Sequence, residues 1–209
     1  MKIIHWAAAG LSLFLATQAL AEGDAAAGQQ KAVVCGACHG VDGNSVVPQW
    51  PKIAGQHEAY LERHITLIRD GARPVPEMMG IVAGLTDQDI ADLAAYFSSQ
   101  TRQPGVADET LASAGAALYR AGRAEMGIPA CMACHGPAGE GNPLAGYPAL
   151  AGQHALYTSN ILKKYRSGTR WGDEDANSGM MVTVAKYLTD EEIESVASYL
   201  QGLHRADSQ

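Results

Sequence analysis

The amino-acid sequence predicts an all-α protein made of two tandem copies of one small domain. The first reason is an internal repeat, because residues 35–39, CGACH, recur in related form at 131–135, CMACH. The second is that apolar residues recur at helical spacing, while no segment alternates as a strand would. The third is Pro104-Gly105, which breaks the helical pattern between the copies and indicates a linker. We therefore expect a cleaved signal peptide in residues 1–21, an N-terminal domain in residues 22–101, a linker in residues 102–107 and a C-terminal domain in residues 108–209.

The repeat can be followed through both copies. An offset of 96 relates the two Cys-x-x-Cys-His segments, and an offset of 97 relates Ala-Gly-Gln-His at residues 54–57 to the same residues at 151–154. An offset of 103 then relates Leu-Thr-Asp at residues 85–87 to residues 188–190. A period this long indicates duplication of a whole domain and not a solenoid of short repeats.

Three helices are expected in each copy. In the first copy they cover residues 24–34, residues 57–69 and a segment that begins at Thr86; in the second they cover residues 108–121, residues 154–166 and a segment that begins at Thr189. The first helix of each copy leads into the cysteines, and the second shows apolar side chains at i, i+3 and i+4. Thr189 and Glu192 form a Thr-x-x-Glu capping box, which marks the start of the last helix.

The two Cys-x-x-Cys-His segments bring a chemical motif into each copy. This pattern is the attachment signature of c-type haem, in which both thiols form thioether bonds to the haem vinyl groups and the histidine binds the iron. The residues concerned are Cys35, Cys38, His39, Cys131, Cys134 and His135. All four cysteines of the chain are used, so none is left for a disulfide. We therefore expect two covalently bound haems c.

Other uses of paired cysteines explain less of the sequence. A redox dithiol of the thioredoxin type lies near a βαβ pattern, which this sequence lacks. One structural zinc bound by both pairs would need a spacing of about 15 to 20 residues, whereas Cys38 and Cys131 lie 93 positions apart. Two disulfides within the pairs suit an oxidising compartment, but they leave the repeated histidine without a role.

The second axial position of each iron is open to methionine, histidine or no ligand. Each copy has paired methionines in a predicted loop before the last helix, Met78-Met79 and Met180-Met181. Counting back seven residues from the aligned Leu-Thr-Asp segments selects Met78 and Met181. The alternative is that these methionines only fill the core.

Further histidines compete with the methionines. His57 and His154 repeat, so iron with two histidine ligands is a rival hypothesis, although their place at a helix start favours a polar or capping role. His64 aligns with Ile161, and His204 lies near the C-terminus. Both are expected to be structural or exposed to solvent.

The N-terminus predicts export. Lys2 precedes a mostly apolar stretch at residues 6–20 and an Ala-Leu-Ala cleavage site at residues 19–21, which is the pattern of a signal peptide. The stretch contains Gln18 and is shorter than the roughly 20 residues of a membrane-spanning helix, which argues against an anchor. Cleavage after Ala21 and transfer to the periplasm also fit the motif, because c-type haem is attached outside the bacterial cytoplasm.

The predicted mature chain is acidic. Cleavage removes one lysine and leaves 14 Lys and Arg against 22 Asp and Glu, a formal charge of −8. This balance argues against nucleic acid and an anionic membrane as primary partners, and it permits steering toward a basic protein surface. No later segment is long and apolar enough to span a bilayer, so any membrane association is expected to be peripheral.

These motifs resemble those of the cytochrome c4 family, periplasmic dihaem electron carriers with two class I cytochrome c domains in tandem. The resemblance covers essentially the whole mature chain and is carried by residues 34–44, VCGACHGVDGN, residues 54–56, AGQ, and residues 199–204, YLQGLH. It implies that the proximal iron ligands are His39 and His135 and that the distal ligands are Met78 and Met181. It also implies that Pro51 and Pro148 follow the loop whose carbonyl accepts the Nδ1–H of each proximal histidine.

The resemblance implies an electron carrier and not an enzyme. An iron with histidine and methionine ligands has no position for a substrate, so it passes one electron at a time by outer-sphere Fe(III)/Fe(II) cycling. We expect redox proteins as partners, with a donor from the respiratory chain and a terminal oxidase as acceptor. Two rival hypotheses are the dihaem subunit of a flavocytochrome c sulfide dehydrogenase and a dihaem peroxidase or thiosulfate-oxidising enzyme with one open haem.

Overall fold

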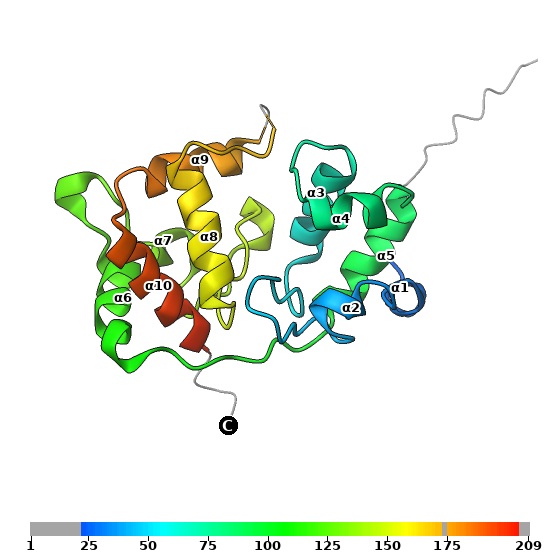
Figure 1. The fold of residues 1–209 in the computed structure, drawn as a ribbon, viewed down its shortest axis with the longest axis horizontal. Coiled ribbons are helices and arrows are strands. Elements are labelled where there is room, and N and C mark those ends of the chain that lie inside the picture. The colour runs from blue at the N-terminus through cyan, green and yellow to red at the C-terminus, as the bar shows by residue number, and fades with distance from the viewer. Residues whose placement is uncertain (1–21, 173–174, 205–209) are drawn as a thin grey trace, which may run out of the picture.

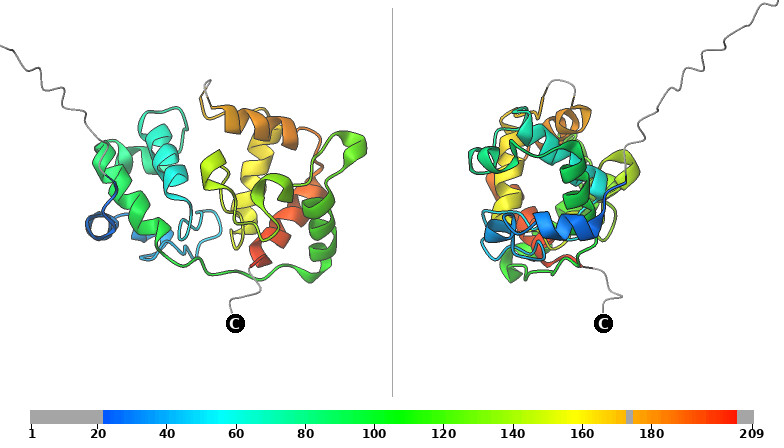
Figure 2. Two further views of the ribbon diagram at one scale, coloured as in Figure 1. Left: turned by 180° about the vertical axis from the view of Figure 1, so that it is seen from behind. Right: turned by 90° about the vertical axis from the view of Figure 1, so that its right-hand side faces the viewer.

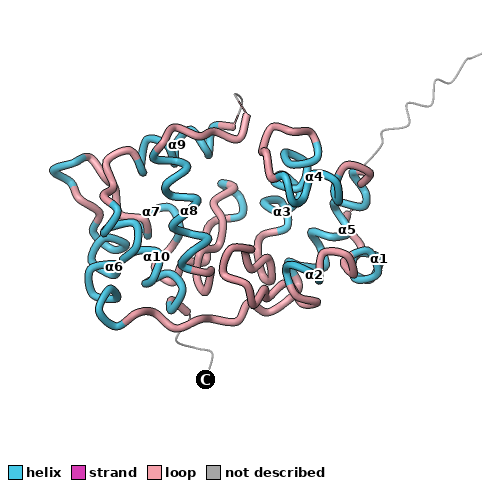
Figure 3. Tube along the Cα trace, in the orientation of Figure 1, coloured by secondary structure: helices cyan, strands magenta, loops and turns pink. Residues whose placement is uncertain are grey.

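The structure is a computed structural model that describes residues 22–172 and 175–204. The signal peptide predicted for residues 1–21 lies outside the described residues. The described part of the chain forms ten α-helices and two short 3₁₀ helices, with no β-strand (Figures 1 and 3). The α-helices are α1 (Ala25–Lys31), α2 (Gly36–His39), α3 (Glu58–Arg69), α4 (Pro76–Val82), α5 (Asp87–Ser98), α6 (Glu109–Ala121), α7 (Met132–His135), α8 (Ala155–Arg166), α9 (Ala176–Ala185) and α10 (Asp190–Gly202). The 3₁₀ helices are η1 (Ala124–Met126) and η2 (Pro143–Ala145).

The helices form two domains that lie side by side (Figures 1 and 2). Helices α1 to α5 make up the N-terminal domain, and α6 to α10 repeat the same order in the C-terminal domain. Residues 101–108 have no regular secondary structure, and they run along one edge of the molecule between the domains. The all-α prediction is therefore confirmed for the described residues.

In each domain the first helix crosses the last one at a glycine. A Cβ atom on Gly28 would lie 1.9 Å from the carbonyl oxygen of Asp92, and one on Gly115 would lie 2.1 Å from that of Ser195. No side chain fits at such distances, so glycine lets α1 pack on α5 and α6 on α10 with direct backbone contact. This crossing holds the segment that carries the cysteines against the last helix.

Both last helices begin with a capping box. The Thr86 hydroxyl accepts the N–H of Asp89, whose carboxylate accepts the N–H of Thr86. Thr189 and Glu192 form the same reciprocal pair at the start of α10. Each box satisfies N–H groups that a helix start otherwise leaves without partners. The predicted helix starts are thus confirmed.

The methionine segments are helical, so the loop predicted for them is wrong. Met78 and Met79 lie in α4, and Met180 and Met181 lie in α9. Pro76 occupies the first position of α4, where its fixed φ angle favours a helix start and its missing N–H costs nothing. The Asp175 carboxylate accepts the N–H groups of the residues at positions 177 and 178 and caps α9.

The two domains differ in their cores. A large cluster in the C-terminal domain centres on aromatic residues, including Tyr119, Tyr165 and Trp171. The N-terminal cluster is smaller and centres on Leu93 and Phe97. Within the described ranges, no helix has both the length and the apolar character that crossing a bilayer requires.

Candidate haem-binding sites

Each Cys-x-x-Cys-His segment folds into a single helical turn. The N–H of His39 donates to the carbonyl of Cys35 at 2.9 Å, and the N–H of His135 donates to that of Cys131 at 3.0 Å. Residues three and four apart on a helix lie on one face, so the two thiols and the imidazole of each motif come from the same side of the turn. All four thiols are free and partly buried.

The two motifs lie in different domains, α2 in the first and α7 in the second (Figure 1). A single zinc ion held by both cysteine pairs would require them to meet around one point. Burial raises the pKa of Cys35 above its usual value and that of Cys131 to about 11. The separation of the two cysteine pairs is what argues against a shared zinc site, because a bound zinc ion would deprotonate its thiol ligands whatever their pKa without metal.

A backbone carbonyl fixes the tautomer of each motif histidine. The Nδ1–H of His39 donates to the carbonyl of Pro51 at 2.8 Å, and that of His135 donates to the carbonyl of Pro148 at 3.0 Å. Because a carbonyl only accepts, Nδ1 carries the proton and Nε2 keeps its lone pair. Burial lowers the pKa of both imidazoles, so they stay neutral. Within the described ranges, no hydrogen bond engages Nε2 of either ring.

A glycine ends each motif in a conformation that other residues avoid. Gly40 has a φ of 78° and Gly136 a φ of 75°. The left-handed backbone reverses the chain straight after the histidine. A side chain on Gly40 would also place its Cβ 2.9 Å from the carbonyl oxygen of Asn44.

An apolar cavity opens beside the motif of the N-terminal domain. Met78 from α4 and Cys35 from the motif line the same cavity. Its other lining residues are Lys31, Val34, Ile65, Ile81, Val82, Leu85, Leu93 and Phe97. Nearly all of these side chains are apolar. Apolar walls, two thiols and a neutral imidazole nitrogen with a free lone pair fit a covalently attached haem.

The two methionines of each pair differ in their surroundings. Met78 is half-buried in the cavity wall, whereas its neighbour Met79 is 43% exposed. In the second copy Met181 and Cys131 both pack against the core cluster, whereas Met180 is 42% exposed. Met78 and Met181, which occupy aligned positions of the repeat, are therefore the methionines that face the interior of their domains.

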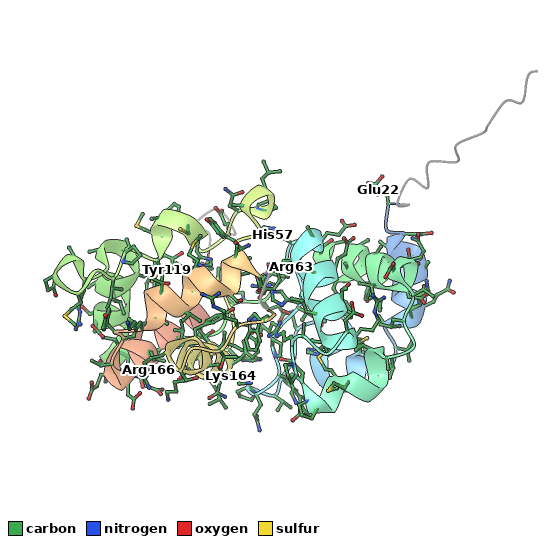
Figure 4. The ribbon with its side chains drawn as sticks, turned by 90° about the horizontal axis from the view of Figure 1, so that it is seen from above. Glu22, His57, Arg63, Tyr119, Lys164 and Arg166 are labelled. Carbon is green, nitrogen blue, oxygen red and sulfur yellow. The ribbon has the colours of Figure 1, made fainter. Side chains whose placement is uncertain are left out.

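His57 and His154 cross between the domains. The Nε2–H of His57 donates to the carbonyl of Glu140 at 2.7 Å, and that of His154 donates to the carbonyl of Ser45 at 2.8 Å. Both histidines precede the first residue of a helix, but neither side chain caps that helix. Of the polar or capping role predicted for them, the polar alternative is therefore the one that the structure supports. Figure 4 shows His57 and Arg63 at the boundary between the domains. Because Nε2 of each ring is engaged by a carbonyl of the other domain, the structure gives these histidines a role between the domains and not as iron ligands.

Glutamines beside these histidines were not identified from the sequence as functional. Gln56 and Gln153 are each 6% exposed. The Gln56 amide bonds to both backbone groups of Ala149, and the Gln153 amide bonds to both backbone groups of Lys52. The repeated Ala-Gly-Gln-His segment is the signal that could have revealed them. These paired contacts form the centre of the seam, the surface along which the two domains meet.

Comparison with known proteins assigns the family. The model of the cytochrome c family matches residues 25–101 and 112–204. The chain is 50% identical to cytochrome c4 of Pseudomonas aeruginosa, over 93% of this chain and 96% of that protein. It is 33% identical to a thiosulfate dehydrogenase electron acceptor of Stutzerimonas stutzeri, over 100% and 99% of the two chains.

Solved structures agree with this result. The crystal structure of reduced recombinant cytochrome c4 from Pseudomonas stutzeri superposes with a TM-score of 0.83 at 49% identity, covering 87% of this chain and all of that one. Two copies of the motif, two helical domains and these similarities support one conclusion. The chain belongs to the cytochrome c4 family and is a dihaem c-type cytochrome that carries electrons on two covalently bound haems c.

Proposed function

We propose that Cys35 and Cys38 attach the first haem, with His39 and Met78 as its axial ligands. Likewise, Cys131 and Cys134 attach the second, with His135 and Met181. The observation that carries this assignment is that the inward methionine occupies the same register position in both domains. Core filling alone does not require that match, because either methionine of a pair could turn inward.

Haem iron held in this way supplies one-electron transfer between its ferric and ferrous states. Two features of the protein adjust this electron transfer: the hydrogen bonds to the proximal histidines and the apolar walls of the cavity. The carbonyls of Pro51 and Pro148 orient the proximal imidazoles and keep Nε2 unprotonated, as a ligand nitrogen must be. The apolar cavity walls exclude water, which favours the less charged ferrous state and raises the reduction potential.

The methionines also decide between a carrier and an enzyme. A peroxidase or a thiosulfate-oxidising haem needs an open or exchangeable position on its iron. With Met78 and Met181 both bound, neither iron has such a position. The protein then works as a carrier between other redox proteins and not as an enzyme.

The site of action that we propose is the periplasm, with a donor from the respiratory chain and a terminal oxidase as acceptor. The predicted signal peptide and the covalent haem support the compartment. A second candidate donor is a thiosulfate dehydrogenase, because relatives named as its electron acceptor match at 33% and 36% identity. Stopped-flow oxidation by a purified terminal oxidase and reduction by a purified thiosulfate dehydrogenase would compare the two partners directly.

The axial ligands can be tested by the near-infrared charge-transfer band that methionine-ligated ferric haem shows. The wild-type protein should give an intensity equivalent to two such haems. Met78→Ala and Met181→Ala should each remove about half of it, whereas Met79→Ala and Met180→Ala should retain it. Full intensity in both inward variants would refute the assignment.

A further inference from the structure

An ion pair crosses from the N-terminal domain to the start of the helix that carries Met181. Arg63, on α3, donates from its Nη2 to the carboxylate of Asp175, the residue directly before α9. Figure 4 shows Arg63 at the boundary between the domains. The Asp175 side chain is only 5% exposed, whereas that of Arg63 is 32% exposed. The C-terminal domain therefore holds a buried carboxylate whose counter-charge comes from the other domain.

The same carboxylate caps α9. Its Oδ1 accepts the N–H groups of Asn177 and Ser178 at 3.1 and 3.3 Å. These groups belong to the first turn of the helix, where the backbone offers them no acceptor, and the helix dipole favours a negative charge at this end. The Oδ2 of Asp175 is buried and accepts no hydrogen bond from the described residues. The cap thus depends on an anion that is removed from water and that Arg63 neutralises.

A second arginine of the N-terminal domain supports the same turn. The Arg73 guanidinium lies 5.0 Å from the centre of the Trp171 ring. The backbone N–H of Trp171 donates to the hydroxyl of Ser178 at 3.1 Å, and that hydroxyl donates to the carbonyl of Asp175 at 3.1 Å. Trp171 and Ser178 are both buried. Contacts from two arginines of one domain therefore converge on the first turn of a helix in the other.

The helix that carries Met78 has no such support. Val75 precedes α4, and its side chain makes no capping hydrogen bond. Within residues 22–172 and 175–204, no hydrogen bond or ion pair joins α4 to the C-terminal domain. The two methionine helices are therefore held in different ways, although they occupy equivalent places in the repeat.

Loss of the arginine should loosen α9 at its start. A buried carboxylate that loses its cation is strongly destabilising, so Asp175 would turn toward water and leave the first turn without its cap. Met181 lies in the second turn of α9. Fraying of the first turn would therefore release the segment that holds the methionine sulfur in place.

We propose that Arg63 and Asp175 are positioning residues for the distal methionine of the second haem, so that contact with the N-terminal domain keeps the second iron closed. This inference rests on the assignment of Met181 in the proposed function. The first haem keeps Met78 without help from the C-terminal domain. Weakening of this contact between the domains should therefore open the second haem and leave the first one closed.

The test measures how fast cyanide replaces each methionine on the ferric haems of the haem-loaded protein, a rate that is limited by opening of the methionine–iron bond. Met78→Ala and Met181→Ala identify the two kinetic phases, because a haem without its methionine binds cyanide without this delay. In Arg63→Gln the phase of the second haem should accelerate about fivefold or more, which is the factor that loss of one helix cap gives. The phase of the first haem should stay unchanged.

Two further variants separate the buried charge from the cap. Asparagine caps a helix about as well as aspartate but carries no charge. Asp175→Asn should therefore bind cyanide at close to the wild-type rate, and Arg63→Gln should have little effect when it is combined with Asp175→Asn. Arg69→Gln is the matched control on the same helix, because its partners Asp70 and Asp87 belong to its own domain. It should leave both phases unchanged.

An unchanged second-haem phase in Arg63→Gln, or equal acceleration at both haems, would overturn the proposal. The same acceleration in the presence of Asp175→Asn would overturn it too, since Arg63 would then act without the carboxylate. If Arg63→Gln does not fold, Asp175→Ala decides, because it removes the cap and the ion pair together. Faster cyanide binding at the second haem alone would support the proposal, and any other result would refute it. A Met181→Ala variant that alters neither phase would instead refute the axial-ligand assignment.

Discussion

The side-chain amide of Gln56 pairs with the backbone of Ala149 across the boundary between the domains. Its Oε1 accepts the N–H of Ala149 at 2.9 Å, and its Nε2 donates to the carbonyl of the same residue at 3.0 Å. Gln153 repeats this pairing with Lys52, at 2.9 Å for both bonds. The duplication has thus produced an interface in which equivalent glutamines of the two domains each form hydrogen bonds with the backbone of the other domain.

Replacing either glutamine by alanine should weaken the interface. Gln56→Ala leaves the N–H of Ala149 without its partner, while the carbonyl of Ala149 keeps the hydrogen bond from Arg102. Gln153→Ala leaves both backbone groups of Lys52 without partners. Each loss should cost about 1–3 kcal/mol. Denaturant unfolding followed by circular dichroism should show this loss and, in the double variant, separate transitions for the two domains. Gln29→Ala, at an exposed position of α1, should stay within about 0.5 kcal/mol of wild type. Equal effects of all three substitutions would contradict the role of the seam.

The helix crossing at Gly28 should not tolerate a side chain. Gly28→Ala would push a methyl group to 1.9 Å from the carbonyl oxygen of Asp92, and the resulting shift of α1 should cost about 1–3 kcal/mol or more. Gly80→Ala is the control, since a Cβ there meets no heavy atom within 4 Å. In that helix interior alanine should stabilise the protein by about 0.5–1 kcal/mol. Thermal unfolding measures both, and a neutral Gly28 variant would disprove the close approach.

Acid should weaken the contact between α1 and α5 through Asp92. Its buried carboxylate accepts hydrogen bonds from Lys31 Nζ, the N–H of Asp24 and Gln88 Nε2, and these partners hold its pKa below the usual 3.8. A lowered pKa in the folded state means that the stabilisation is present above pH 3.8 and is lost as pH falls below it. The free energy of unfolding should therefore decline more steeply with acid in wild type than in Asp92→Asn. Parallel pH profiles would show that the carboxylate does not contribute.

Loss of an inward methionine should open one haem to small ligands. Met78→Ala and Met181→Ala should each bind one equivalent of carbon monoxide in the ferrous state, because the vacated iron position becomes accessible. The exposed neighbours Met79 and Met180 provide the matched variants, which should bind none. Photometric titration with carbon monoxide measures the stoichiometry. Binding to the wild-type protein would instead favour an enzymatic haem.

Local sequence signals predicted most of the helical structure. Helix α3 was expected over residues 57–69 and covers Glu58–Arg69, and α8 was expected over residues 154–166 and covers Ala155–Arg166. Helix α1 ends at Lys31, before the predicted limit at residue 34. The helices that carry the methionines were missed, because Pro74 and Pro76 were interpreted as loop residues although proline favours the first position of a helix.

The sequence by itself determined the duplication, the two haem motifs and the methionine register, because each depends on the spacing of residues within one copy. Only the tertiary structure decided the roles of Gln56, His57 and their repeats. Those contacts join residues as far as 109 positions apart, as between Ser45 and His154. They depend on how two folded surfaces meet, and a repeat within the chain does not encode the orientation in which its copies dock.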